Sequence, residues 1–342
     1  MVRKLIPALL LIALSLPLFA SGADVSITGG VIKSGNTDAL ITYAAEVTPY
    51  YTFSDQNLKG EIRGDLILND TMVILSLKRA DFRFRLPSFG GKKVTLTAGR
   101  SPLSWGLGSY YRIGDVLLDG MSSNIKAGVS DSRNVWLVSA SQSLGSGFNL
   151  EAAAVLPIPS TVTFTQAGSM ITQGEKAAIG AKLKKSIDTK TLKAVQLSAS
   201  YSEEKVTSLA AAFDASLWFD ITGGAETKFR AGNDIRAAVN MTKFISLEGE
   251  TVSVQLGLYL AGEFDFFKKE YQACTALSLT PTERLTLYLA ITNSFSEGGY
   301  SGLDAYSTLS FIISDSVRAE TVFAYTHNED AFTGMLTLKS AF

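Results

Sequence analysis

The sequence alternates apolar and polar residues in short segments from about residue 25 to its last residue. A period of two residues is typical of β-strands that have one apolar face. The segment 284–295 shows this pattern clearly, with Leu285, Leu287, Leu289, Ile291 and Phe295 on one face and Thr286, Tyr288, Ala290, Thr292 and Ser294 on the other. A secreted β-sandwich or β-helix would also alternate, but its outward faces would carry charge. The chain is therefore predicted to be all-β, with apolar faces that need a lipid environment.

Eighteen such segments can be counted, and most are about 9–13 residues long, the length that a tilted strand needs to cross a bilayer. An even number of strands is the rule for single-chain bacterial barrels. The segments 224–231 and 235–244 are the weakest, and their loss would leave sixteen strands. The predicted strands are 25–33, 38–53, 57–68, 72–86, 93–100, 133–143, 148–156, 175–187, 191–202, 206–218, 224–231, 235–244, 251–263, 270–280, 284–295, 303–313, 317–327 and 332–342.

The connections between these segments differ in length. The two longest, 101–132 and 157–174, are the fifth and the seventh, and the even-numbered connections are short. In barrels of this kind the long loops face outward and the short turns face the periplasm. The pattern predicts a transmembrane antiparallel barrel with short turns and both termini in the periplasm.

The start of the chain indicates export. Arg3 and Lys4 precede an apolar run that ends at Phe19 and is followed by small residues, which predicts a signal peptide over 1–23 and a barrel over 24–342. A retained membrane helix is the alternative, although the run is short for one. Without residues 1–23 the net charge is −3, which argues against nucleic acid as a partner. Lone Cys274 cannot form an internal disulfide.

The last segment, 332–342, keeps one apolar face up to the terminal residue, Phe342. This ending resembles the C-terminal signature of Gram-negative outer-membrane β-barrel proteins of the porin type. The resemblance implies a cell outer-membrane location, outer-membrane lipid as surroundings, and recognition of Phe342 by the barrel-assembly machinery.

Charged residues gather on two neighbouring predicted strands. Because charges on the lipid side of a barrel cost a few kcal/mol, they are expected to face the lumen. A bulge near Lys78 and Arg79 would explain why the apolar face changes phase there. The predicted wall either sets up a field that orients polar solutes or is a self-neutralising ladder that fills a wet interior. It consists of Lys59, Glu61, Arg63, Asp65, Asp81, Arg83 and Arg85.

The fifth connection is too apolar and aromatic to remain in water, so we expect it to fold into the barrel mouth as a constriction. Gly106 and Gly108 would allow it to approach the wall closely. The alternative is a structural loop that plugs or braces the barrel. We call residues 101–132 the constriction loop. Its candidate residues, together with Arg100 at the end of the preceding strand, are Trp105, Tyr110, Tyr111, Arg112 and Asp115.

The same stretch is similar to a segment of alginate-export-like outer-membrane barrels. Gly99-Arg100, Ser104-Trp105-Gly106-Leu107-Gly108 and Asp115 match that segment, whereas Tyr111-Arg112-Ile113-Gly114 departs from it. The resemblance implies a channel for solutes.

Catalysis is not expected, because His327 is the only histidine and barrel hydrolases need a histidine beside a serine or an aspartate. No metal or other cofactor is predicted.

The sequence favours a porin-like channel for passive diffusion of small hydrophilic solutes. The alternative is a plugged surface barrel that acts as a structural protein or adhesin. Solute identity and association into a homo-oligomer are left open.

Overall fold

The computed structural model describes most of the chain from Gly22 onward. The described residues are 22–35, 37–69, 71–89, 92–103, 105–108, 111, 114–118, 133–165, 168–172, 174–187, 189–229, 233–248 and 253–341. Residues 1–21, which contain most of the predicted signal peptide, and the terminal Phe342 lie outside this set.

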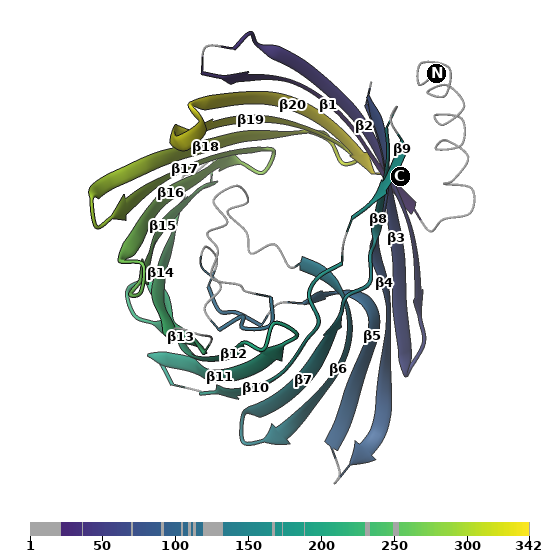
Figure 1. Cartoon of the computed structure of the whole chain (residues 1–342), viewed down its shortest axis with the longest axis vertical. Coiled ribbons are helices and arrows are strands. Elements are labelled where there is room, and N and C mark those ends of the chain that lie inside the picture. The colour runs from purple at the N-terminus through teal and green to yellow at the C-terminus, as the bar shows by residue number, and fades with distance from the viewer. Residues whose placement is uncertain are drawn as a thin grey trace.

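The described residues form twenty β-strands in one antiparallel sheet that closes on itself, because β1 pairs with both β2 and β20 (Figure 1). The strands are β1 (Gly22–Ser34), β2 (Leu40–Ser54), β3 (Leu58–Leu68), β4 (Met72–Phe89), β5 (Lys92–Leu103), β6 (Arg133–Gly145), β7 (Phe148–Leu156), β8 (Thr161–Thr165), β9 (Gly168–Ile171), β10 (Ala178–Ser186), β11 (Leu192–Ser202), β12 (Thr207–Ser216), β13 (Asp220–Phe229), β14 (Asn233–Glu248), β15 (Ser253–Asp265), β16 (Glu270–Thr282), β17 (Leu285–Ser296), β18 (Gly299–Ser314), β19 (Val317–Thr326) and β20 (Ala331–Ala341).

Eighteen of these strands make the complete ring, since β7 pairs directly with β10 and the short strands β8 and β9 form an additional hairpin. All eighteen predicted segments are confirmed, and the sixteen-strand alternative is wrong because β13 and β14 form a full ladder. Among the described residues, no helix is long and apolar enough to span a membrane.

The two ends of the barrel differ. At the end where Gly22 and Ala341 lie, which we call the turn end, each connection has at most five residues. The opposite end, the loop end, carries the two long connections, one between β5 and β6 and one between β7 and β10. The predicted sorting of long and short connections is therefore confirmed.

The two faces of the sheet differ in polarity, as predicted. On β17, Leu289 and Ile291 are 41% and 46% exposed on the outside, whereas the alternating residues Ala290 and Thr292 are buried on the inside. On β20, Phe332, Leu336 and Leu338 are likewise exposed. Only an apolar solvent such as the hydrocarbon of a bilayer suits such an outer surface.

The hairpin of β8 and β9 was not predicted. The β4–β5 ladder ends at Ala80 and Arg100, next to Gly99, whose φ of +117° suits glycine and marks where β5 turns away. Beyond that point β5 pairs with β6 alone, and β8 occupies the free edge of β4 from Met72 to Ser76. The hairpin therefore extends the wall where β5 leaves it.

Candidate functional site

The predicted charges lie together on the lumen side of β3 and β4, at positions alternating with exposed Ile62, Phe82 and Phe84. The strand register places like charges directly opposite each other. Glu61 faces Asp81, and Arg63 faces Arg79. The wall therefore consists of alternating acidic and basic levels, and bases of one level pair with acids of the next.

A bulge makes this arrangement possible. The β3–β4 register shifts between Arg63 and Gly64, so that Lys78 has no partner residue on β3 and lies on the same side as Arg79. The predicted bulge is thus confirmed. Arg79 pairs with Glu61 at 2.6 Å and with Asp81, which is 1% exposed.

The wall is wider than predicted, because β1 and β2 contribute to it. Lys78 lies 2.9 Å from both Glu46 on β2 and Asp65 on β3, and Arg63 lies 3.6 Å from Asp24 on β1. Lys59 and Arg85 are exposed near the turn end and make no ion pair within the described residues. We call the whole set the charge wall: Asp24, Glu46, Lys59, Glu61, Arg63, Asp65, Lys78, Arg79, Asp81, Arg83 and Arg85.

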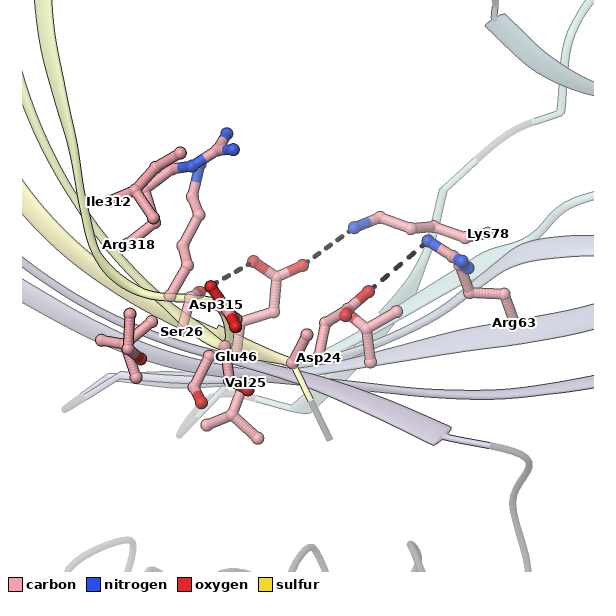
Figure 2. A pocket seen from close by; sticks show the side chains of 16 residues that line it. Asp24, Val25, Ser26, Glu46, Arg63, Lys78, Ile312, Asp315 and Arg318 are labelled. Carbon is pink, nitrogen blue, oxygen red and sulfur yellow. Dashed lines mark hydrogen bonds and ion pairs between the residues drawn. The ribbon is translucent and has the colours of Figure 1, made fainter. Parts of the chain in front are cut away.

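A cavity of about 440 Å³ lies between the charge wall and the turn that joins β18 to β19. Figure 2 shows Glu46 paired with Lys78 and Asp24 paired with Arg63 on one side of this cavity. Arg318 extends into the cavity from the other side. The charged side chains therefore border open space at the turn end of the lumen.

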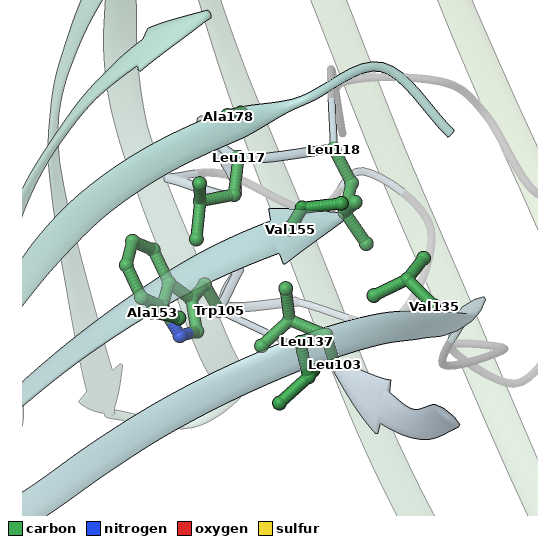
Figure 3. Close-up of a cluster of buried hydrophobic side chains, with 9 residues drawn as sticks. All are labelled: Leu103, Trp105, Leu117, Leu118, Val135, Leu137, Ala153, Val155 and Ala178. Atoms are coloured by element: carbon green, nitrogen blue, oxygen red, sulfur yellow. The ribbon is translucent and has the colours of Figure 1, made fainter. Parts of the chain in front are cut away.

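The constriction loop runs along a different part of the barrel from the charge wall. Trp105 is 1% exposed and packs with Leu103, Leu117 and Leu118 against apolar residues of β6, β7 and β10 (Figure 3). Its indole N–H donates to Glu151 Oε1 at 2.9 Å. Glu151 in turn pairs with Lys182 at 2.9 Å, so Trp105, Glu151 and Lys182 form a partly buried polar group.

Tyr111 is a second anchor. Its ring is fully buried among small residues of β12 and β14–β17, including Ala261 and Cys274. Its backbone N–H donates to Asn240 Oδ1 at 2.9 Å, and its carbonyl accepts from Asn240 Nδ2 at 3.1 Å. Burial raises the pKa of the Tyr111 phenol, so the ring stays neutral.

One face of β11 holds the backbone of the loop. Gln196, Ser198 and Ser200 donate to the carbonyls of Trp105, Gly114 and Val116 at 2.7, 2.7 and 2.6 Å. These bonds satisfy loop carbonyls that would otherwise be buried without partners.

Several predicted roles in the constriction loop change. Tyr111 and Asp115 were expected to line the opening, but both are buried and cannot line it. Trp105, the other predicted residue of the loop that the structure describes, is buried as well. Arg100 belongs to β5, opposite Ala80, and lies on the other face of the strand from buried Ser101. Tyr110 and Arg112 lie outside the described residues.

The predicted close approach at Gly108 is confirmed. Its φ is +96°, and a Cβ there would meet the Asn240 amide. Sequence reasoning missed the positions that receive the loop. The small residues at inward positions of β12 and β14–β17 make room for Tyr111 and its neighbours.

Comparisons with known proteins show the fold. No family model matches the chain, and no curated protein matches it. OpdK of Pseudomonas aeruginosa, solved with vanillate, is similar in structure with a TM-score of 0.55, 9% identity and coverage of 94% of this chain and 98% of that chain. A BenF-like porin from Pseudomonas fluorescens Pf-5 has a TM-score of 0.56 and 8% identity, with coverage of 95% of this chain and 99% of that chain. OccK2 (OpdF) of Pseudomonas aeruginosa, in complex with glucuronate, has a TM-score of 0.56 and 9% identity, with coverage of 94% of this chain and 96% of that chain.

The chain therefore has the fold of outer-membrane channels, and its eighteen-strand closed barrel confirms the predicted fold class. None of these comparisons shows the predicted similarity to alginate-export-like barrels.

Proposed function

We propose that the protein is an outer-membrane channel for passive diffusion of small hydrophilic solutes. The charge wall carries this proposal, because its ionised side chains lie inside a closed barrel whose outside is apolar. Exposed Lys59, Arg83 and Arg85 need water around them, so the lumen beside the wall must be wet. A barrel of this size encloses an aqueous path unless it is plugged.

The constriction loop narrows this path from one side. Its anchors, Trp105 and Tyr111, pack against β6, β7, β10, β12 and β14–β17, whereas the charge wall is on β1–β4 (Figure 1). Solutes would pass between the loop and the charge wall, and the acidic and basic levels of the wall would orient their dipoles.

The solute class follows from the polarity of the wall and from structural likeness. OpdK and OccK2 were solved with vanillate and glucuronate, which are small and polar. We infer that solutes of similar size and polarity pass through this barrel. The relation of residues 99–115 to alginate-export-like channels remains a prediction.

We place the turn end and both termini in the periplasm, with the long connections outside. The short connections at the turn end support this orientation. The predicted roles of residues 1–23 as a signal peptide and of Phe342 as an assembly signal belong to the same proposal.

Planar-bilayer recording of the refolded protein tests the channel. The intact barrel should conduct. Deletion of 103–118 should raise the conductance, because the loop then no longer narrows the lumen. The alternative, a plugged structural barrel, predicts no conductance from the intact protein. A silent barrel that is folded, as judged by its migration on unheated gels, would overturn the proposal.

A further inference from the structure

A row of four alanines crosses the outer face of the sheet at one level. The strand register pairs Ala140 of β6 with Ala152 of β7, Ala152 with Ala181 of β10, and Ala181 with Ala199 of β11. The next level toward the turn end carries larger residues, among them Leu183. The row is therefore the floor of a hollow in the membrane-facing surface.

Two adjoining apolar cavities of about 670 and 780 Å³ lie over this floor, and both are lined by Ala181 and Ala199. Other parts of the outer face carry bulky side chains, such as Leu289 on β17 and Leu336 on β20. A hollow lined by alanines lets an apolar chain approach the sheet closely. There the chain makes more dispersion contacts with the protein than it would make in bulk lipid.

A cation marks the turn-end side of the hollow. The outward residues of β10 run from Ala181 through Leu183 to Lys185. Lys185 Nζ lies 4.9 Å from the centroid of the Phe148 ring and forms no ion pair within the described part of the chain. In contrast, Lys193 at the same rim is paired with Asp220 at 2.7 Å. Lysines beside aromatic rings are typical of the interface between hydrocarbon and head groups.

We propose that this hollow binds an anionic phospholipid of the periplasmic leaflet. Its phosphate would meet Lys185, and an acyl chain would lie over the alanine row. Ala181 and Lys185 are four residues apart, or about 13 Å along the strand. With the strand tilted by about 40°, this is about 10 Å along the membrane normal, so the alanine row lies within the roughly 15 Å depth of one leaflet of the hydrocarbon core. The choice of leaflet depends on the proposed orientation of the barrel, but the binding itself does not depend on channel function.

Native mass spectrometry of the full chain in detergent tests this site, with phosphatidylglycerol and phosphatidylcholine added separately as probes. Wild type should retain phosphatidylglycerol more strongly. Lys185→Gln should weaken that retention about fivefold, the effect of one interfacial lysine. Ala181→Leu with Ala199→Leu should weaken retention of both lipids by filling the hollow.

Lys176→Gln is the matched control, because Lys176 precedes the other end of β10 and pairs with Glu204 in an exposed position. It should leave binding unchanged.

Equal retention of both lipids, or unchanged binding in Lys185→Gln, would overturn the site. Loss in Lys176→Gln alone would place the head group at the loop end of β10 and would also overturn the site. Dimers that the double leucine variant dissociates would show that a second copy occupies the hollow. Lipid binding by a folded barrel that conducts nothing would overturn the proposed function and leave this inference standing.

Discussion

Asp81 shows how a carboxylate is accommodated inside the barrel wall. It is almost completely buried, yet it contacts the guanidinium groups of Arg79 and Arg83. A buried charge is tolerated when it is paired, and removing one partner leaves the other uncompensated. The electrical character of the lumen therefore depends on single residues of the charge wall.

Asp81→Asn should shift ion selectivity toward anions. The substitution removes one negative charge and keeps the shape of the side chain, so Arg79 and Arg83 contribute more positive potential to the lumen. The reversal potential under a KCl gradient measures the shift. Asp55→Asn, in the turn between β2 and β3, is the control and should have little effect. A shift toward cations in Asp81→Asn would contradict the assignment of the charge wall.

Asn240→Ala should loosen the constriction loop. Asn240 makes two hydrogen bonds to the backbone of Tyr111, and their loss should weaken the anchor by about 2 kcal/mol. We expect a noisier open-channel current and faster proteolysis near Tyr111, both compared with wild type. Asn149→Ala changes an exposed residue at the turn end of β7 and should alter neither. An equally quiet current in Asn240→Ala would show that the loop does not depend on this anchor.

At the scale of elements, alternation located all eighteen strands of the ring because each strand separates lipid from lumen. The hairpin of β8 and β9 carries the same signal, since Thr161, Thr163 and Thr165 alternate with Val162 and Phe164. Five residues are too few to identify a strand from pattern alone. Its partner on β4 is also remote in sequence, so no local turn indicates the pairing.

The inward folding of the constriction loop could be predicted from its apolar composition, but the roles of its residues could not. An aromatic residue in such a loop can face water or the wall, depending on receiving positions that lie far away in sequence. For Tyr111 these are Asn240 and small residues such as Ala276 and Ala290. One chain gives no sign that these positions belong together.

Replacement of 161–171 by a short glycine-serine linker should destabilise the barrel without opening the ring. The edge of β4 from Met72 to Ser76 would lose its partner strand, at a cost of several kcal/mol if each lost bond contributes about 1 kcal/mol. The temperature at which the barrel loses its compact migration on gels should fall. An unchanged temperature would show that the hairpin adds nothing to the wall.

At the scale of the whole molecule, two parts of the ring have different tasks. β1–β4 carry the charge wall, whereas β6, β7, β10–β12 and β14–β17 hold the constriction loop by buried contacts. The outer surface is apolar on both parts. This division leaves a polar path along one side of the interior.

The orientation of the barrel can be tested on intact cells. An epitope inserted at Glu203–Lys205, in the loop-end turn between β11 and β12, should be labelled by antibody from outside. The same epitope at Asp55–Gln56, in a turn-end connection, should be labelled only after the outer membrane is permeabilised. The reverse pattern would contradict the proposed orientation.

The most direct test of the account measures current through a barrel in which Arg83 is replaced by cysteine. Arg83 is partly exposed on the charge wall, and the native Cys274 is buried beneath the loop. A charged, membrane-impermeant thiol reagent should reduce the conductance of Arg83→Cys. It should not affect wild type or Phe323→Cys, whose thiol would face lipid. A folded Arg83→Cys barrel that carries no current, or whose current the reagent leaves unchanged, would contradict a water-filled path beside the charge wall.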